Sequence, residues 1–176
     1  MKRFITILLA VLTAVSLAAC AKKAPEGEKK PNDSGNVGIA NPWIDCDTLV
    51  DAAKLAGFDV TVPGKFEGYP NKVYQAVEKS MIQVLYFDGD PAAETSSMIM
   101  VRKGTGSDDI SGDYNDYPEK GSVNVNGVDV SIKGKDGLIF NAVWTWEGYS
   151  FAINADKGIT KEALTAAIEE MLTVAG

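Results

Sequence analysis

An Asn-Gly dipeptide between two alternating runs is the feature that most constrains the fold. Residues 123–130 read Val-Asn-Val-Asn-Gly-Val-Asp-Val. Asn-Gly between alternating apolar residues is the strongest short signal for a β-hairpin with a two-residue turn. In that register Val125 faces Val128 and Val123 faces Val130, so the valines share one side of the hairpin. The segment therefore predicts antiparallel sheet with one apolar face.

A second hairpin is predicted over residues 138–154, with its turn at the Glu-Gly pair at 147–148. Alternate residues of a strand share a face, so this register places the aromatic side chains of both strands on the same side. Those aromatic residues are Trp144, Trp146, Tyr149 and Phe151.

Two amphipathic segments predict helices at 48–56 and 161–174. Asp47 or Thr48 is placed to cap the first, and Thr160 is placed to cap the second. In both segments the apolar residues recur at helical spacing, which gives each helix one face for packing.

Further segments rich in β-forming residues predict strands at 58–62, 72–79, 81–87 and 95–103. One helix before and one helix after a series of antiparallel strands is the pattern of an α+β domain. We expect an antiparallel sheet of about six or seven strands, with an N-terminal and a C-terminal helix packed on one face.

Residues 1–19 are typical of a bacterial lipoprotein signal peptide. A Lys-Arg pair precedes an apolar run at 4–19, which is the arrangement of an export signal. The run ends in Leu-Ala-Ala-Cys at 17–20, which resembles a lipobox, the site where the lipoprotein-processing peptidase cuts before a diacylated cysteine. We therefore expect Cys20 to become the lipidated first residue, carrying diacylglycerol and a further acyl chain such as palmitate. The alternative is an ordinary secretory signal in which Cys20 is incidental.

The rest of the chain divides into a linker and one domain. Residues 20–40 comprise Cys20 and a segment rich in Lys, Glu, Pro and Gly, a composition that predicts a flexible tether. Residues 41–176 are long enough for a single domain with its own core. We expect this domain to lie outside the cytoplasm, anchored to the cell membrane by its lipid.

The composition excludes several classes of function. The chain has 17 Lys and Arg, 24 Asp and Glu, and no His, and loss of Lys2 and Arg3 with the signal peptide takes its formal net charge from −7 to −9. A charge of this sign disfavours nucleic acid as a partner. With no His, and with Cys46 as the only thiol besides Cys20, a Ser-His-Asp triad, a Cys-His pair and the common zinc sites are excluded.

Several landmarks along residues 41–176 resemble one family. They are Asn41-Pro42-Trp43, Ala56-Gly57-Phe58, Val62-Pro63, the segment from Asp109 to Tyr114, the tryptophan-containing strand, and Gly158-Ile159-Thr160. Together they resemble an uncharacterised family of bacterial lipoprotein domains of unknown function, similar to extracytoplasmic domains attached to anti-sigma-factor-like membrane proteins. The resemblance implies an α+β sheet domain and supplies no catalytic residues.

An acidic loop at 104–120 is one candidate site. Hard cations such as Ca²⁺ bind several oxygen ligands, above all carboxylates. The oxygen-bearing residues that could hold a cation are Asp109, Ser111, Asp113, Asn115 and Asp116. The EF-hand template fails, because it requires Gly where Tyr114 stands and Glu where Lys120 stands. The alternative is a turn whose Asp and Ser side chains cap backbone amides.

The aromatic face is the other candidate site. Trp144, Trp146 and Tyr149 are suited to stacking on a sugar ring or a peptide if they are exposed, whereas more often such a face is core beneath a helix. Trp43 is able to join either arrangement.

The sequence therefore predicts a membrane-anchored extracytoplasmic lipoprotein that acts as a non-catalytic binding or sensing module, with an envelope protein or a glycan as its ligand. One alternative is a calcium-assisted ligand-binding domain. Another is a small envelope hydrolase that uses two carboxylates, which is chemically sufficient for glycoside cleavage. No other cofactor is expected, and the lipid bilayer is the partner of the Cys20 anchor.

Overall fold

The computed structural model describes residues 41–173. The predicted signal peptide at 1–19, the lipidation site Cys20 and the tether up to residue 40 lie outside the described residues, as does the predicted last residue of the second helix, Val174. Within the described part, no helix is both long enough and apolar enough to cross a membrane.

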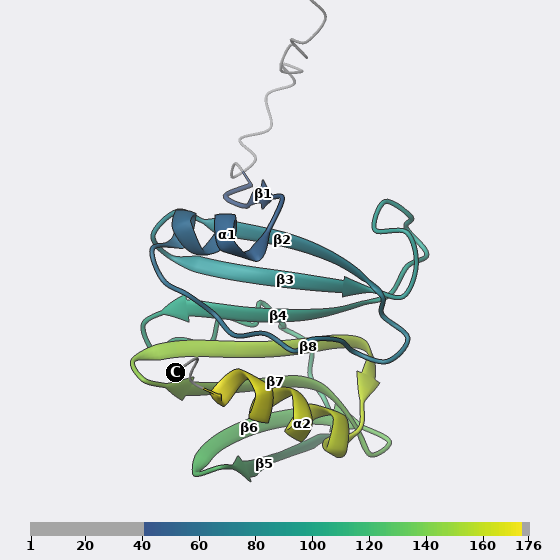
Figure 1. The fold of residues 1–176 in the computed structure, drawn as a ribbon. Helices are drawn as coiled ribbons and strands as arrows, with labels where there is room; N and C mark the ends of the chain where they lie inside the picture. Colours follow the sequence, from purple (N-terminus) through teal and green to yellow (C-terminus); the bar gives the residue numbers. More distant parts are fainter. Residues whose placement is uncertain (1–40, 174–176) are drawn as a thin grey trace, which may run out of the picture. The chain divides into compact units, whose positions relative to one another are not determined.

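The domain is built on one eight-stranded sheet in which all neighbouring strands run antiparallel. The strands lie in the order β1-β2-β3-β4-β8-β7-β6-β5, so the C-terminal strand β8 is inserted between β4 and β7 (Figure 1). Their bounds are β1 (Ile44–Cys46), β2 (Asn71–Val77), β3 (Met81–Phe87), β4 (Met98–Thr105), β5 (Glu119–Val125), β6 (Val128–Lys135), β7 (Leu138–Trp146) and β8 (Tyr149–Ile159).

Two helices complete the fold, and both begin where the predicted caps stand; the first also ends at its predicted glycine, whereas the second ends at Leu172, before the predicted Val174. Helix α1 (Leu49–Ala56) begins after Thr48, whose hydroxyl accepts a hydrogen bond from the Asp51 amide, and ends at Gly57, whose φ of 82° suits only a glycine well. Helix α2 (Lys161–Leu172) begins after Thr160, which accepts from the amide of Ala163 in the same way.

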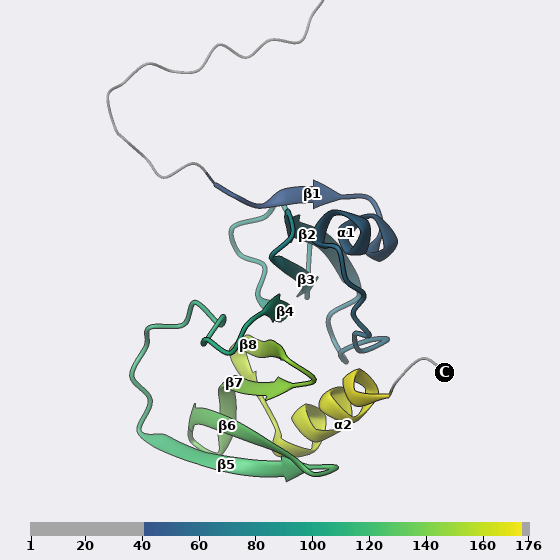
Figure 2. The same cartoon turned by 90° about the vertical axis from the view of Figure 1, so that its left-hand side faces the viewer.

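Both helices lie on the same side of the sheet, here called the helix face (Figure 2). Ile82, Val84 and Tyr86 alternate along β3 and point to this face. Ile82 packs with the buried alanines of α1, while Val84 and Tyr86 join the larger core that includes Leu164 of α2. The main core thus lies between the sheet and α2, with a smaller cluster under α1.

The opposite side of the sheet, here called the loop face, is crossed by residues 106–118, which connect β4 to β5 (Figure 2). The side-chain amide of Asn154 on β8 donates a hydrogen bond of 2.9 Å to the Ser111 carbonyl in this connection. Tyr117 stacks on Phe140 of β7, with ring centroids 5.5 Å apart. The candidate acidic loop therefore covers the centre of the loop face.

The fold confirms the α+β class, the antiparallel sheet and both predicted hairpin registers. Val125 pairs with Val128 and Trp146 pairs with Tyr149, as the turn positions predicted. The expected number of about six or seven strands was wrong, because the sheet has eight.

Residues 58–62 do not form the strand that their composition predicted. They cross the helix face as an irregular segment, whose side chains pack on the sheet instead of its backbone pairing within it. Phe58 packs on Tyr149 with ring centroids 5.0 Å apart, and Lys103 donates a 2.6 Å hydrogen bond to the Asp59 carbonyl. Just beyond, the Pro63 carbonyl accepts a 2.7 Å hydrogen bond from the buried hydroxyl of Tyr86.

Candidate functional site

The alternating polar residues of the acidic loop bond to the loop's own backbone. The Ser111 amide donates to Asp109 Oδ1 at 2.8 Å, the Asp113 amide to Ser111 Oγ at 3.2 Å, and the Asn115 amide to Asp113 Oδ1 at 2.9 Å. Each side chain thus caps the amide two residues further on, which is the turn chemistry that favours Asp, Asn and Ser in loops. The capping alternative is confirmed for these residues.

The remaining oxygens of the loop are also engaged in part. Asp113 Oδ2 accepts a 2.9 Å hydrogen bond from the Tyr117 hydroxyl, and Asp116 forms an exposed ion pair with Lys120 at 2.7 Å. Within residues 41–173, no group of three or more acidic, His or Cys side chains is arranged to hold a metal ion. Calcium binding by this loop stays a prediction.

Arg102 of β4 fixes the loop to the sheet. Its Nη1 donates to the carbonyl oxygens of Ile110 at 2.8 Å and Ser111 at 3.1 Å, and the Trp43 ring lies 5.0 Å from its guanidinium carbon. Sequence reasoning missed this role, because nothing in the order of residues shows that an arginine on a strand lies beneath a loop that follows it.

A row of polar side chains crosses the loop face from β1 to Arg102. The residues Asp45, Gln75, Gln83 and Arg102 lie directly opposite one another on four neighbouring strands. Gln75 donates to Asp45 at 2.7 Å, Gln83 donates to Gln75, and Arg102 Nε donates to Gln83 at 2.8 Å. The side-chain amides of Gln75 and Gln83 thus connect the carboxylate of Asp45 to the guanidinium of Arg102, and each of the four side chains has a hydrogen-bond partner within the row.

The aromatic face divides into a buried part and a half-buried part. Trp144 is only 4% exposed and lies parallel to Phe151, with ring centroids 5.2 Å apart. The proposal of Trp144 as an exposed stacking residue was therefore wrong, because the helix face is covered around it. Trp146 and Tyr149 keep intermediate exposure, and Lys103 Nζ lies 4.0 Å from the Tyr149 ring.

Two open hollows on the loop face contain carboxylates. One, of about 290 Å³, includes Asp108, Asp109 and Asp129, and the other, also of about 290 Å³, includes Asp113 and Asp156. A general acid needs a raised pKa. Burial raises the pKa of Asp109, but its hydrogen bonds from Ser111 outweigh this and leave that pKa lowered. Asp109 is therefore not tuned to act as an acid.

A smaller hollow of about 190 Å³ adjoins the edge strand β5, near the beginning of α2. No pattern of residues indicated this hollow beforehand, since its walls come from four separate elements. Its lining is mostly apolar or glycine, with charged residues among it: Glu119, Lys120, Gly121, Ile132, Lys133, Gly134, Gly137, Leu138, Ile139 and Lys161.

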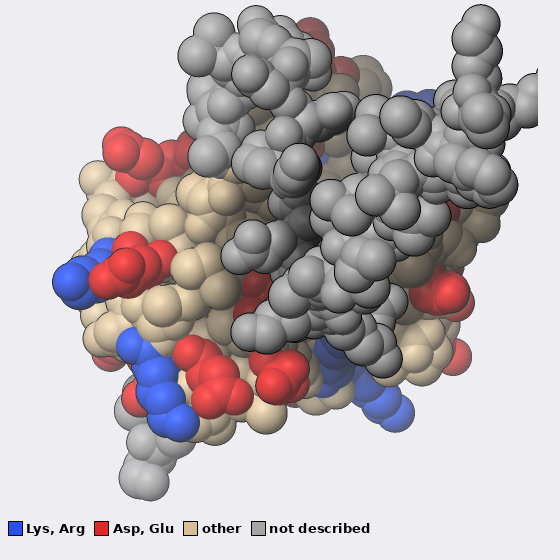
Figure 3. All heavy atoms as spheres, turned by 90° about the horizontal axis from the view of Figure 1, so that it is seen from above, with Lys and Arg blue, Asp and Glu red and all other residues tan. Residues whose placement is uncertain are grey.

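Several acidic side chains lie at the edge of the sheet at β1 and α1, and Figure 3 shows acidic groups together with basic ones on this side of the molecule. Asp45, Asp47 and Asp51 are exposed there and line an open hollow together with Cys46. Partial burial and the charge of Asp51 raise the pKa of the Cys46 thiol, which makes its reactive thiolate less available. This surface thus carries exposed carboxylates beside a thiol whose reactivity is lowered.

Comparison of the chain with protein-family models, with curated proteins and with solved structures found no match.

Proposed function

We propose that the mature chain is an extracytoplasmic lipoprotein, held to the cell membrane by a diacylated Cys20. The observation that carries this proposal is the Leu-Ala-Ala-Cys sequence at 17–20, at the end of an apolar run with basic residues before it. Small residues before the cysteine fit a narrow protease subsite, and only a cysteine supplies the thioether that holds the lipid. Two or more acyl chains anchor a protein stably, whereas one chain binds reversibly.

The domain 41–176 acts as a non-catalytic binding or sensing module at the membrane surface. Support comes from the side chains that could take part in catalysis, because they form contacts that stabilise the fold. Arg102 holds a loop, Asp109 and Asp113 cap backbone amides, and Trp144 is core. The resemblance to uncharacterised lipoprotein domains is in keeping with such a role. A partner protein or a glycan of the envelope is the ligand we expect.

The segment between Cys20 and the domain sets the distance over which the module works. At about 3.3–3.6 Å per residue, its 20 residues span at most about 70 Å when fully extended. The domain therefore searches a shell close to the membrane for its ligand.

The anchor is tested by metabolic labelling with an alkyne analogue of palmitate, in cells that express the full chain, the Cys20→Ser variant or the Cys46→Ser variant. We expect the full chain and Cys46→Ser to carry label and to fractionate with membranes. Cys20→Ser is expected to lose both properties. Cys46 provides the matched control because it is the other cysteine of the chain. The proposal would be contradicted if mass spectrometry detected a chain with an intact Met1 terminus, or if Cys20→Ser still carried the palmitate label.

A further inference from the structure

The two edges of the sheet differ in how well they are protected. The edge strand β1 has three residues, and Asp45 and Asp47 place negative charge along it. Short length and charge are the usual means by which a native edge avoids pairing with another chain. The other edge strand, β5, has seven residues and pairs with β6 without a bulge. From Gly121 to Val125 it carries neither a charge nor a proline.

The outer side of β5 has free hydrogen-bonding capacity. Asn126 and Gly127 have φ of 50° and 89°, the values of a type I′ turn, which makes Val125 and Val128 the first hydrogen-bonded pair of the hairpin. Since bonding alternates along an antiparallel pair, the residues with amides and carbonyls directed outward are Lys120, Ser122 and Asn124. In residues 41–173, no backbone group outside β6 bonds to them, and these three residues are exposed.

A hollow lies beside this edge on the helix face. Gly121 of β5 is the Cα partner of Ile132 on β6, and both line the hollow of about 190 Å³. Because Gly121 has no side chain, no side chain of β5 separates the open edge from Ile132 at this position. A residue paired to β5 opposite Gly121 is able to extend its side chain over the glycine into this space.

We propose that β5 accepts an extended segment of a partner protein as a further strand of the sheet, with an apolar side chain seated over Gly121 against Ile132. Main-chain bonds along an edge strand give such complexes their affinity, and pockets for alternate side chains give them specificity. This inference deepens the proposed binding function and rests on it, but it does not depend on the lipid anchor.

The charges around the hollow indicate a carboxylate close to the apolar residue of the partner. Lys161 lines the hollow and forms no ion pair within residues 41–173. The side chains of Lys120 and Lys133 alternate with those of Gly121 and Ile132 and so point to the loop face, where Lys120 is paired with Asp116. The acidic residue in the lining, Glu119, accepts a 3.1 Å hydrogen bond from the Gly137 amide. An acidic side chain or a C-terminal carboxylate of the partner is thus the complementary group.

A second copy of the chain is a poorer occupant of this edge. Two copies repel each other, because without Lys2 and Arg3 of the predicted signal peptide each has 15 Lys and Arg against 24 Asp and Glu, a formal net charge of −9. A pairing limited to seven residues of one strand also buries less than the roughly 1,200–2,000 Å² of a stable protein interface. An unstructured partner segment needs less area, since only a strand of it has to dock.

The test uses the mature chain from residue 20 with Cys20→Ser, so that it carries no lipid, and a phage library of random eight-residue peptides as the probe. Three variants accompany it. Ser122→Pro removes an outward amide, which an edge strand tolerates. Ser122→Thr retains that amide and is its matched control. Gly121→Leu fills the hollow, and its Cβ makes only an ordinary 3.9 Å contact with Ile132.

We expect the selected peptides to share an apolar residue next to an acidic one. They should bind the parent chain and Ser122→Thr equally, and bind Ser122→Pro and Gly121→Leu about tenfold more weakly. Binding should also slow hydrogen exchange at the Lys120, Ser122 and Asn124 amides of the parent chain, a measurement that requires no variant to fold.

Three results would overturn the proposal. In the first, the library yields no peptide that prefers the parent chain to Ser122→Pro. In the second, bound peptide leaves exchange at these amides unchanged. In the third, the parent chain sediments as a dimer that Ser122→Pro dissociates, which would make a second copy the occupant. None of these results bears on the Cys20 anchor, because the palmitate experiment tests that separately.

Discussion

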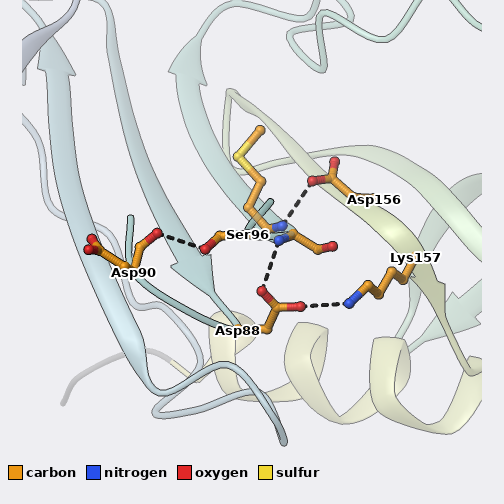
Figure 4. A network of polar contacts seen from close by, with 7 residues as sticks. Asp88, Asp90, Ser96, Asp156 and Lys157 are labelled. Carbon is orange, nitrogen blue, oxygen red and sulfur yellow. Dashed lines mark hydrogen bonds and ion pairs between the residues drawn. The ribbon is translucent and has the colours of Figure 1, made fainter. Parts of the chain in front are cut away.

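The Lys157 ammonium on β8 donates a 2.7 Å hydrogen bond to the carboxylate of Asp88, which follows β3 directly (Figure 4). The other oxygen of Asp88 accepts a 2.8 Å hydrogen bond from the Ser97 amide. Next to Lys157, Asp156 accepts a 2.9 Å hydrogen bond from the Met98 amide at the start of β4. These bonds fix both ends of the β3–β4 connection to β8, across 69 residues of sequence at Asp88 and 58 residues at Met98.

The first prediction concerns the dependence of stability on pH. The hydrogen bond from Lys157, and secondly that from the Ser97 amide, lower the pKa of Asp88 below its ordinary value of 3.8. A carboxyl whose folded pKa is lowered stabilises the fold above its unfolded pKa, and this stabilisation is lost as pH falls through the folded pKa. Asp88→Asn should therefore melt at a lower temperature than the parent chain at pH 7, and the difference should shrink as pH falls below 3.8 and through the lowered pKa of Asp88.

The same contact predicts an alkaline limit. The Asp88 carboxylate raises the pKa of Lys157 above 10.5, so the stabilisation by this ammonium is lost as pH rises through the raised value. Thermal melts of Asp88→Asn, and of Glu78→Gln as a control, check both limits. Glu78 pairs with its neighbour Lys79, and both are well exposed, so Glu78→Gln should change little. An equal effect of the two variants at pH 7 would contradict this account.

Arg102 provides the second prediction. Arg102→Met retains much of the side-chain volume but leaves the carbonyls of Ile110 and Ser111 without their charged donor. Hydrogen bonds to a charged group contribute about 1.5–3 kcal/mol, so we expect the free energy of unfolding to fall by about 2 kcal/mol. Hydrogen exchange at the Ser111 and Asp113 amides should become faster, because the loop loses its attachment to β4.

Urea unfolding and hydrogen exchange of Arg102→Met, compared with Lys135→Met, measure these effects. Lys135 is an exposed residue of β6 with no ion pair in the described part of the chain. If Arg102→Met left loop exchange as slow as in the parent chain, the guanidinium would not be what holds the loop.

Local signals in the sequence were sufficient for the elements that depend on neighbouring residues. The Asn-Gly turn determined the pairing of Val125 with Val128, and Thr48 and Gly57 determined both ends of α1. These features follow from backbone conformation at single positions, which residue type controls.

Contacts between residues far apart in the sequence could not be predicted from such local signals. β1 is three residues long, too short to show alternation, and it pairs with β2 across a helix and a long connection. Residues 58–62 have the composition of a strand, but they pack their side chains on the helix face and do not pair within the sheet. In the acidic loop, alternate oxygen side chains suit a cation and also suit a series of capped amides, so the order of residues did not show that the amides of Ser111, Asp113 and Asn115 are capped.

The third prediction tests the position of Trp144 in the core. Trp144→Ala should lower the free energy of unfolding by about 3–5 kcal/mol, the usual cost of removing a buried aromatic side chain. Trp146→Ala should cost less, because Trp146 is only partly buried. Chemical denaturation measures both values. Quenching of tryptophan fluorescence by acrylamide adds a second measurement, in which loss of Trp144 should raise the quenchable fraction. A smaller loss of stability for Trp144→Ala than for Trp146→Ala would refute the assignment of Trp144 to the core.

The acidic loop provides the last prediction. Asp109 and Asp113 already use one oxygen each to cap the amides of Ser111 and Asn115. Calcium needs six to eight oxygen ligands, and a cation here would have to displace some of these bonds. We therefore expect titration with Ca²⁺ to produce no heat in calorimetry and no change in melting temperature. Asp109→Ala and Asp113→Ala should each reduce stability by about 1 kcal/mol through lost caps, whether or not Ca²⁺ is present. Heat of binding that disappears in both variants would instead establish the loop as a calcium site.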